Sequence, residues 1–191
     1  MKPRIVPLGD SAVLVQLGDE IDLTVNQRVH TLANLITTSA INGIIETVPA
    51  YATLLVHYDS LTFSFTQIKN FLREKLAQIR ENESRKPRLV EVPAQYGGEL
   101  GPDLDVVASH LGLRVEDIIR IHSEKIYTVY MMGFTPGYPY MGKLDDKLVM
   151  PRLETPRDGL ERLRHLGRRG ALLGGRVGHL RHLVLRQPDP V

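Results

Sequence analysis

The first part of the chain alternates short β-rich runs with longer segments whose apolar residues recur at helical spacing. Residues 4–8 and 12–17 are mostly apolar, and a Gly-Asp pair follows each of them, as expected for strands that lead into turns. Residues 43–48 and 53–58 are β-branched runs separated by the segment PAYA at 49–52, which predicts a hairpin. The pattern therefore predicts two pairs of strands.

Two amphipathic helices are predicted, one between the strand pairs and one after them. From residue 23 to about residue 38, apolar side chains repeat on one face, with Asp22 as the N-cap and Gly43 just past the end. Ser64 opens the second helix, because its hydroxyl can accept from the backbone N–H of Gln67 while the Gln67 side chain reaches back. This reciprocal arrangement predicts a capping box.

The predicted order is strand, strand, helix, strand, strand, helix. Two helices laid on one face of a small sheet give an α+β sandwich of the ferredoxin-like kind, with an extra hairpin at the start. We assign residues 1–80 to this domain. Residues 81–88 are polar and charged and contain a proline, so they are interpreted as a linker.

The second half combines glycine-rich loops with shorter elements. A strand is predicted from residue 89, then a loop containing Gly97 and Gly98 that enters a helix at about Pro102. A second short helix is predicted for residues 115–121, and His122 follows directly after it. The glycine N–H groups, near a helix N-terminus, could hold a carboxylate or phosphate, but the segment lacks a P-loop ending, so a structural turn stays the alternative.

The segment GFTPGYPYMG, residues 133–142, follows a predicted buried strand at 127–132. Its Pro-Gly pair suits the centre of a type II turn. Tyr138 and Tyr140 are two apart on an extended segment and should face the same side. A stiff loop with aromatic rings loses little entropy when something binds, which favours a recognition surface. The alternative is a tight turn whose rings cap the local core.

Composition narrows the class of protein. The 191 residues are 42% hydrophobic and 24% charged, as in ordinary globular domains. The absence of cysteine excludes disulfides, thiolate metal sites and cysteine nucleophiles, and no metal site is predicted. The N-terminus lacks the apolar run of a signal peptide, and no stretch approaches the roughly 20 apolar residues of a membrane span. We expect a cytoplasmic protein with neither membrane nor nucleic acid as partner.

Four segments occur in one order between Tyr96 and Arg157: YGGELGPDL, IRIHS, YMMGFTPGYPYMGKL and PRLETPR. They resemble the signature of a bacterial family that contains the B subunit of 5-oxoprolinase, allophanate hydrolase subunit 1 and the inhibitor of a sporulation histidine kinase. The resemblance implies that residues 89–157 form the first part of a cyclophilin-like β-barrel, incomplete at its C-terminus.

The resemblance also implies a function. The chain would act with the A subunit and with a C subunit of homologous fold to hydrolyse 5-oxoproline (pyroglutamate) to L-glutamate, with ATP used by the assembled complex. Two alternatives stay open, because the residues do not separate them. One is a regulatory protein that inhibits a histidine kinase, and the other is an allophanate hydrolase or urea carboxylase-like subunit 1.

The resemblance implies a set of substrate- or partner-binding residues without assigning catalytic ones. Its tyrosines and Phe134 are expected to form an aromatic wall, and His122 and Arg152 to contact an anionic substrate. The full set is Tyr96, Gly97, Gly98, Asp103, His122, Phe134, Pro136, Gly137, Tyr138, Tyr140, Arg152 and Arg157.

The resemblance stops after Arg157. Residues 158–191 hold seven arginines against three acidic residues, with no lysine and no aromatic residue. Three interpretations compete: a reading-frame slip near codon 158, a variant tail forming a basic helix through Leu160, Leu163 and Leu166, or a nucleic-acid-binding tail that attracts phosphates. Because the family ending supplies later barrel strands, its loss predicts an unpaired sheet edge.

Overall fold

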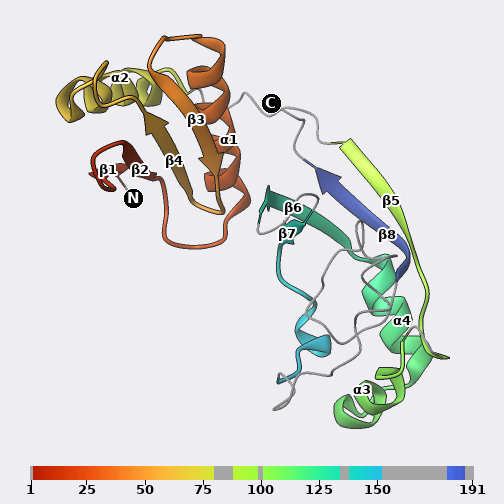
Figure 1. Ribbon diagram of the computed structural model, residues 1–191. Coiled ribbons are helices and arrows are strands. Elements are labelled where there is room, and N and C mark those ends of the chain that lie inside the picture. Colours follow the sequence, from red (N-terminus) through yellow and green to blue (C-terminus); the bar gives the residue numbers. More distant parts are fainter. Residues whose placement is uncertain (1, 80–87, 99–100, 134–137, 152–179, 188–191) are drawn as a thin grey trace. The chain divides into compact units, whose positions relative to one another are not determined.

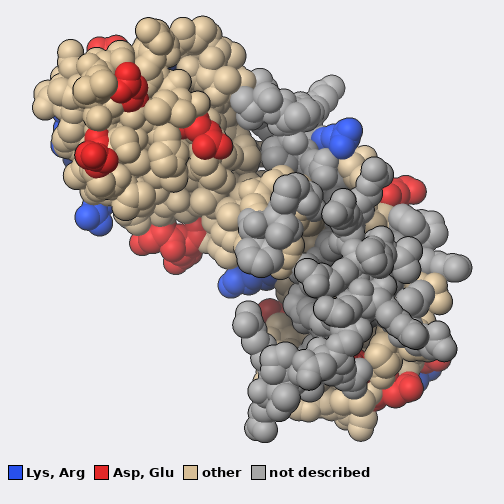
Figure 2. Space-filling model, viewed as in Figure 1, with Lys and Arg blue, Asp and Glu red and all other residues tan. Residues whose placement is uncertain are grey.

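The computed structural model describes residues 2–79, 88–98, 101–133, 138–151 and 180–187 (Figure 1). The chain divides into two compact units, Met1–Lys86 and Pro87–Gln187. Each unit is described by itself. On the face shown in Figure 2, acidic and basic side chains of the first unit are scattered rather than gathered into a patch of one sign.

The first unit contains a four-stranded antiparallel sheet. Its strands are β1 (Arg4–Pro7), β2 (Ala12–Gln16), β3 (Ile44–Pro49) and β4 (Thr53–Tyr58), in the spatial order β1-β2-β4-β3. Since β2 and β3 both run antiparallel to β4, they are parallel to each other and β4 lies between them. The helix that joins β2 to β3 therefore completes a split β-α-β unit.

Helix α1 (Leu23–Thr38) begins where the sequence predicts, with Asp22 Oδ1 accepting from the Val25 N–H at 2.8 Å. Its end at Thr38 also agrees with the prediction of about residue 38, and the C-cap is Ser39. The hydroxyls of Thr37 and Ser39 donate to carbonyls one turn back, and Ala40, at φ +45°, takes the left-handed position after the C-cap. Gly43, at φ +97°, leads into β3.

Helix α2 (Phe65–Ala77) confirms the predicted capping box. The Gln67 N–H donates to Ser64 Oγ at 3.4 Å, and the Ser64 N–H donates to Gln67 Oε1 at 2.9 Å. Both helices and the sheet contribute to one apolar core. Its most buried members include Val13, Val15, Val29, Leu32, Ile36, Leu54, Val56, Ile68 and Leu72.

The second unit contains a mixed sheet of the spatial order β5-β8-β6-β7. Its strands are β5 (Arg88–Ala94), β6 (Ile126–Met132), β7 (Pro139–Met141) and β8 (Leu180–Gln187). Strand β8 pairs antiparallel with β5 and parallel with β6, while β6 and β7 form an antiparallel pair.

Strand β8 belongs to the divergent tail and occupies an inner position of this sheet, while β5 and β7 are its edge strands among the described residues, so the unpaired edge stays a prediction. It lies between β5 and β6, and its register runs from Arg88 opposite Gln187 to Ala94 opposite Leu180. Its backbone therefore pairs with the inner edges of both neighbours, which would otherwise expose rows of unpaired N–H and C=O groups. The basic helix proposed around Leu160–Leu166 lies outside the described residues.

The helices of the second unit precede β6. Helix α3 (Leu104–Leu111) begins two residues later than predicted and ends, as predicted, at Gly112, whose φ is +63°. Helix α4 (Val115–Glu124) is longer than predicted and includes His122. A short 3₁₀ helix, η2 (Asp146–Leu148), follows β7.

Two small apolar clusters stabilise this unit. One gathers around Tyr127 and Val129 on the sheet, and the other gathers around Leu104 and Ile118 on the helices. Tyr96 packs against both clusters and so links the sheet to the helices. Among the described residues, no helix combines the length and the apolar character that a membrane span requires.

Candidate functional site

The structure brings some of the predicted site residues together as pairs. Tyr96 follows β5 and contacts His122 of α4, while Tyr138 and Tyr140 lie together at β7. Asp103 lies at the N-cap of α3, without a side-chain capping bond. Gly97 and Gly98 lie in the turn after Tyr96. The other predicted residues lie outside the described residues: Phe134, Pro136, Gly137, Arg152 and Arg157.

A short hydrogen bond joins Tyr96 to His122. The Tyr96 hydroxyl lies 2.7 Å from His122 Nδ1, and the two rings meet edge to face with centroids 5.8 Å apart. Ile118 and His122 are the two buried residues of α4, one turn apart on its inward face. The end of β5 is thus tied to α4 through a polar contact inside the unit.

Burial keeps both partners of this bond neutral at pH 7. His122 has 0% exposure, and desolvation lowers its pKa to about 4. Desolvation also raises the pKa of Tyr96 to about 12. We assign the Tyr96 O–H as the donor to Nδ1, because a phenol is a better donor than acceptor, and this assignment places the His122 proton on Nε2.

Tyr127 is the third member of this cluster, and the sequence alone did not assign it to the site. It lies in β6, is 1% exposed, and its ring centroid is 5.6 Å from that of His122. Burial, followed by the charges of Tyr96 and Asp145, raises its pKa. The alternating pattern of the strand could have indicated it, because Tyr127 and Val129 face inward and alternate with less buried neighbours.

Two polar atoms of the cluster lack a partner. Within the part of the chain that the structure describes, His122 Nε2 and the Tyr127 hydroxyl are buried and make no hydrogen bond. Buried polar groups are nearly always paired, so such atoms require an explanation such as a ligand, a water or a catalytic role. We name Tyr96, His122 and Tyr127 the buried polar cluster.

The glycine loop after Tyr96 is a tight turn closed on its own backbone. Gly97 and Gly98 have φ values of +71° and +61°, and the Gly101 N–H donates to Gly97 O at 3.1 Å. Positive φ at successive positions favours glycine. These contacts agree with the structural-turn interpretation, and carboxylate or phosphate binding stays a prediction.

Tyr138 and Tyr140 form an aromatic pair. Their ring centroids are 5.1 Å apart at an angle of 51°, and both side chains are partly exposed, as the spacing predicts for one side of an extended segment. The Gly133 N–H donates to Tyr138 O at 3.1 Å and closes the hairpin. A methyl group on Gly133 would lie 3.4 Å from Tyr140 Cε2, so the backbone lies close beneath the ring.

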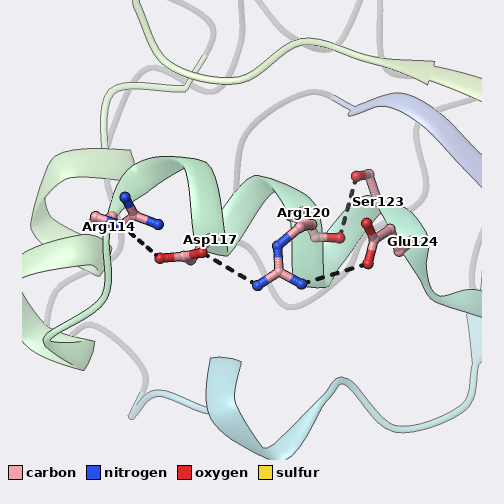
Figure 3. Close-up of polar contacts among 5 residues, drawn as sticks. All are labelled: Arg114, Asp117, Arg120, Ser123 and Glu124. Carbon is pink, nitrogen blue, oxygen red and sulfur yellow. Dashed lines mark hydrogen bonds and ion pairs between the residues drawn. The ribbon is translucent and has the colours of Figure 1, made fainter.

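The outward face of α4 carries a ladder of ion pairs (Figure 3). Arg114 Nε lies 2.9 Å from Asp117, Arg120 lies 3.3 Å from the same carboxylate, and Arg120 lies 3.7 Å from Glu124. Hydrogen bonds from Arg114 and then Arg120 lower the pKa of Asp117. Exposed pairs of this kind add little stability. Ser123 donates to Arg120 O, so its hydroxyl is engaged on this helix.

The described side chains do not form a metal-binding cluster. Among them, no three His, Asp or Glu residues lie close enough together to hold an ion.

Comparison with known proteins places the chain in a family. Residues 3–162 match the model of the carboxyltransferase domain, subdomain C and D, and the chain belongs to this family. The match ends soon after Arg157, where the resemblance of the motifs also stops. The membership confirms that resemblance.

Curated relatives in this family carry one name, the B subunit of 5-oxoprolinase. The relative from Bacillus subtilis (strain 168) is 38% identical over 167 residues, which cover 82% of this chain and 70% of the relative. The relative of the same name from Haemophilus influenzae is 35% identical over 154 residues, 81% of this chain and 70% of the relative.

Solved structures agree on the fold. The chain is 32% identical to the protein TTHA0988, with a TM-score of 0.65 over 76% of this chain, and it spans only 28% of that longer protein. It also resembles the urea amidolyase of Kluyveromyces lactis, with 17% identity and a TM-score of 0.52 over 69% of this chain and 9% of that one. At that identity the likeness concerns the fold alone.

Proposed function

We propose that this chain is the B subunit of an ATP-dependent 5-oxoprolinase, which hydrolyses 5-oxoproline to L-glutamate. The observation that carries the proposal is the 38% identity, over 82% of the chain, to a relative named as the B subunit of 5-oxoprolinase. Relatives of the same name in two further bacteria match a similar share of the chain.

The proposal includes partner subunits, because the designation B implies others. The chain acts with the A and C subunits of the enzyme, and ATP is used by the assembled complex rather than by this chain alone. A five-membered lactam is a stable amide, so ATP-driven activation accounts for the coupling.

The proposal also specifies the two folds. The split β-α-β unit with two helices supports a ferredoxin-like domain for residues 1–80, in which β1 takes the place of the last ferredoxin strand beside β2. Residues 89–157 form the first part of a cyclophilin-like domain, and residues 81–88 link the two.

The aromatic pair Tyr138–Tyr140 contributes to a surface that contacts substrate or another subunit of the complex. Both rings are partly exposed beside a hairpin closed by the Gly133–Tyr138 hydrogen bond. Rigid aromatic side chains provide contact area at a low entropic cost. Phe134 and Arg152, which the sequence predicts as binding residues, lie outside the described residues.

Reconstitution tests the function. The chain is mixed with the products of its neighbouring subunit genes, 5-oxoproline and ATP, and glutamate release is measured. We expect release that disappears when this chain or ATP is omitted. Release that continues at the same rate without this chain, or no release from the complete mixture, overturns the proposal.

A further inference from the structure

The turn that joins α1 to β3 contains an asparagine followed by a glycine, at positions 42 and 43 (Figure 1). The Ile44 N–H donates to Ile41 O at 3.3 Å, so Asn42 and Gly43 occupy the two central positions of this turn. Gly43 has φ +97°, a left-handed conformation that favours glycine. A methyl group there would also lie 2.6 Å from Thr62 Cγ2, so both the conformation and the space require glycine.

The amide of Asn42 lies in an unprotected position. Asn42 is exposed, and neither its side chain nor the Gly43 N–H makes a hydrogen bond to any described residue. The side-chain amide carbon of an asparagine closes a five-membered ring when it bonds to the next backbone nitrogen. Glycine hinders this ring closure least, because it has no Cβ and its backbone adopts many conformations. The glycine that the turn requires is therefore also the neighbour that favours the reaction.

The other asparagines in the described part of the chain lie in helices. Asn26 and Asn34 belong to α1 and Asn70 belongs to α2. Asn26 is also 3% exposed and donates to two backbone carbonyls. Asn70 is exposed like Asn42, but the next residue is Phe71, whose N–H belongs to the hydrogen bonds of the helix. Asn42 is thus distinguished by its turn and its glycine, and not by exposure alone.

We propose that Asn42–Gly43 is a site of spontaneous deamidation, in which the chain modifies itself with water as the co-reactant. The Gly43 nitrogen attacks Asn42 Cγ, the N–Cγ bond forms and the Cγ–Nδ2 bond breaks. The proton of the Gly43 N–H leaves with the amide nitrogen as ammonia. Water then opens the resulting succinimide at one of its two carbonyls. Opening at Cγ gives aspartate, and opening at the backbone carbonyl gives isoaspartate, in which the main chain runs through the side chain.

Isoaspartate adds one methylene to the main chain directly before β3. At this point Gly43 O accepts from the Asp59 N–H at 2.8 Å, and Ile44 begins the pairing with Tyr58. A methyl group on Gly43 would lie 3.0 Å from the ring of Phe63, which packs against the apolar core of the first unit. The backbone therefore has little room to move here, and we expect the longer main chain to weaken the start of β3.

Incubation of the complete chain at pH 8.5 and at pH 6 tests the proposal. Mass spectrometry of its peptides, with fragmentation, follows the conversion of each asparagine amide to an acid. A protein isoaspartyl methyltransferase with a labelled methyl donor identifies isoaspartate in the peptide that contains residue 42. Asn70 is the internal control. Asn42→Gln is the matched variant, because glutamine would have to close a six-membered ring, which forms more slowly. Tm is measured before and after incubation.

We expect Asn42 to convert about tenfold or more faster than Asn70, because an amide in a helix reacts only when the helix opens locally. Conversion at Asn42 should be faster at pH 8.5 than at pH 6, since the attacking nitrogen must lose its proton. The peptide should accept the methyl label in the wild type and lose it in Asn42→Gln. The Tm of the incubated wild type should fall by several degrees, while that of incubated Asn42→Gln stays constant.

Other results contradict the proposal. Equal rates of conversion at Asn42 and Asn70, or an Asn42 amide that stays intact at pH 8.5, would overturn the site. Conversion to isoaspartate with no change in Tm would overturn its effect on β3. The test uses this chain alone, so its result is independent of the proposed function.

Discussion

Tyr96 Oη lies 2.7 Å from His122 Nδ1, which ties the chain just after β5 to the inward face of α4. With the Tyr96 hydroxyl assigned as the donor, the proton of this fully buried imidazole lies on Nε2. A histidine held in this way is a neutral donor, with no charge to offer an anion. The expected contact between His122 and an anionic substrate is therefore restricted to hydrogen bonding.

The lowered pKa of His122 predicts a loss of stability in mild acid. Its pKa falls from 6.5 to about 4 on folding, so the neutral form is favoured in the folded chain. The associated stability is fully present above pH 6.5 and is lost as the pH falls toward 4, by up to roughly 3 kcal/mol. Urea unfolding at pH 7.5 and pH 4.5 measures this loss. His122→Phe should show a smaller difference between the two pH values, and an equal difference contradicts the assignment.

The capping box of α2 predicts a cost for removing Ser64. Ser64→Ala leaves the Gln67 N–H without its acceptor and should lower the free energy of unfolding by about 1 kcal/mol. Thr66→Ala, two positions along the same helix and exposed, is the control and should cost nothing. Chemical denaturation measures both variants, and equal stabilities would contradict the capping role.

Replacing Gly43 with alanine should cost stability for two reasons, the positive φ of the backbone and a steric clash of the new methyl group. It has φ +97°, and a methyl group there would lie 2.6 Å from Thr62 Cγ2. Gly9 has φ +70° with nothing within 4 Å of such a methyl group, so it reports the conformational cost alone. Gly43→Ala should destabilise the chain by about 1–3 kcal/mol more than Gly9→Ala does. Equal losses would show that Thr62 moves aside freely.

The first unit was predictable from sequence because its signals are local. Asp22, Ser64 and Gln67 act within one helical turn, and the strands around the 49–52 turn pair with each other. The second unit depends on contacts between distant segments. Nothing near residue 180 indicates that Leu180–Gln187 lies between β5 and β6, because that pairing joins strands far apart in the chain.

The candidate site was predictable only in part for the same reason. The motifs singled out Tyr96 and His122, and the spacing of Tyr138 and Tyr140 predicted their shared side. Tyr127 looked like an ordinary strand residue, because burial beside an imidazole depends on how β6 packs against α4. A pairwise contact of this kind leaves no periodic pattern in the sequence.

The aromatic pair predicts a contact surface. Replacing Tyr138 and Tyr140 together with alanine removes two partly exposed rings whose centroids are 5.1 Å apart. We expect binding to the other subunits to weaken by about tenfold or more, as for aromatic residues central to an interface. Pull-down and titration with those subunits measure this effect. The control is Ile126→Ala, which removes an exposed apolar side chain on β6. If the double variant binds the other subunits as tightly as the wild type does, the aromatic pair is not part of the contact surface.

The most direct test of the central claim is a titration of this chain into its proposed partner subunits with 5-oxoproline and ATP in excess. A B subunit is a stoichiometric component of the complex, so glutamate release should rise with each addition and level off at a fixed molar ratio. A rate that stays constant at every amount of this chain would contradict its role in a 5-oxoprolinase complex.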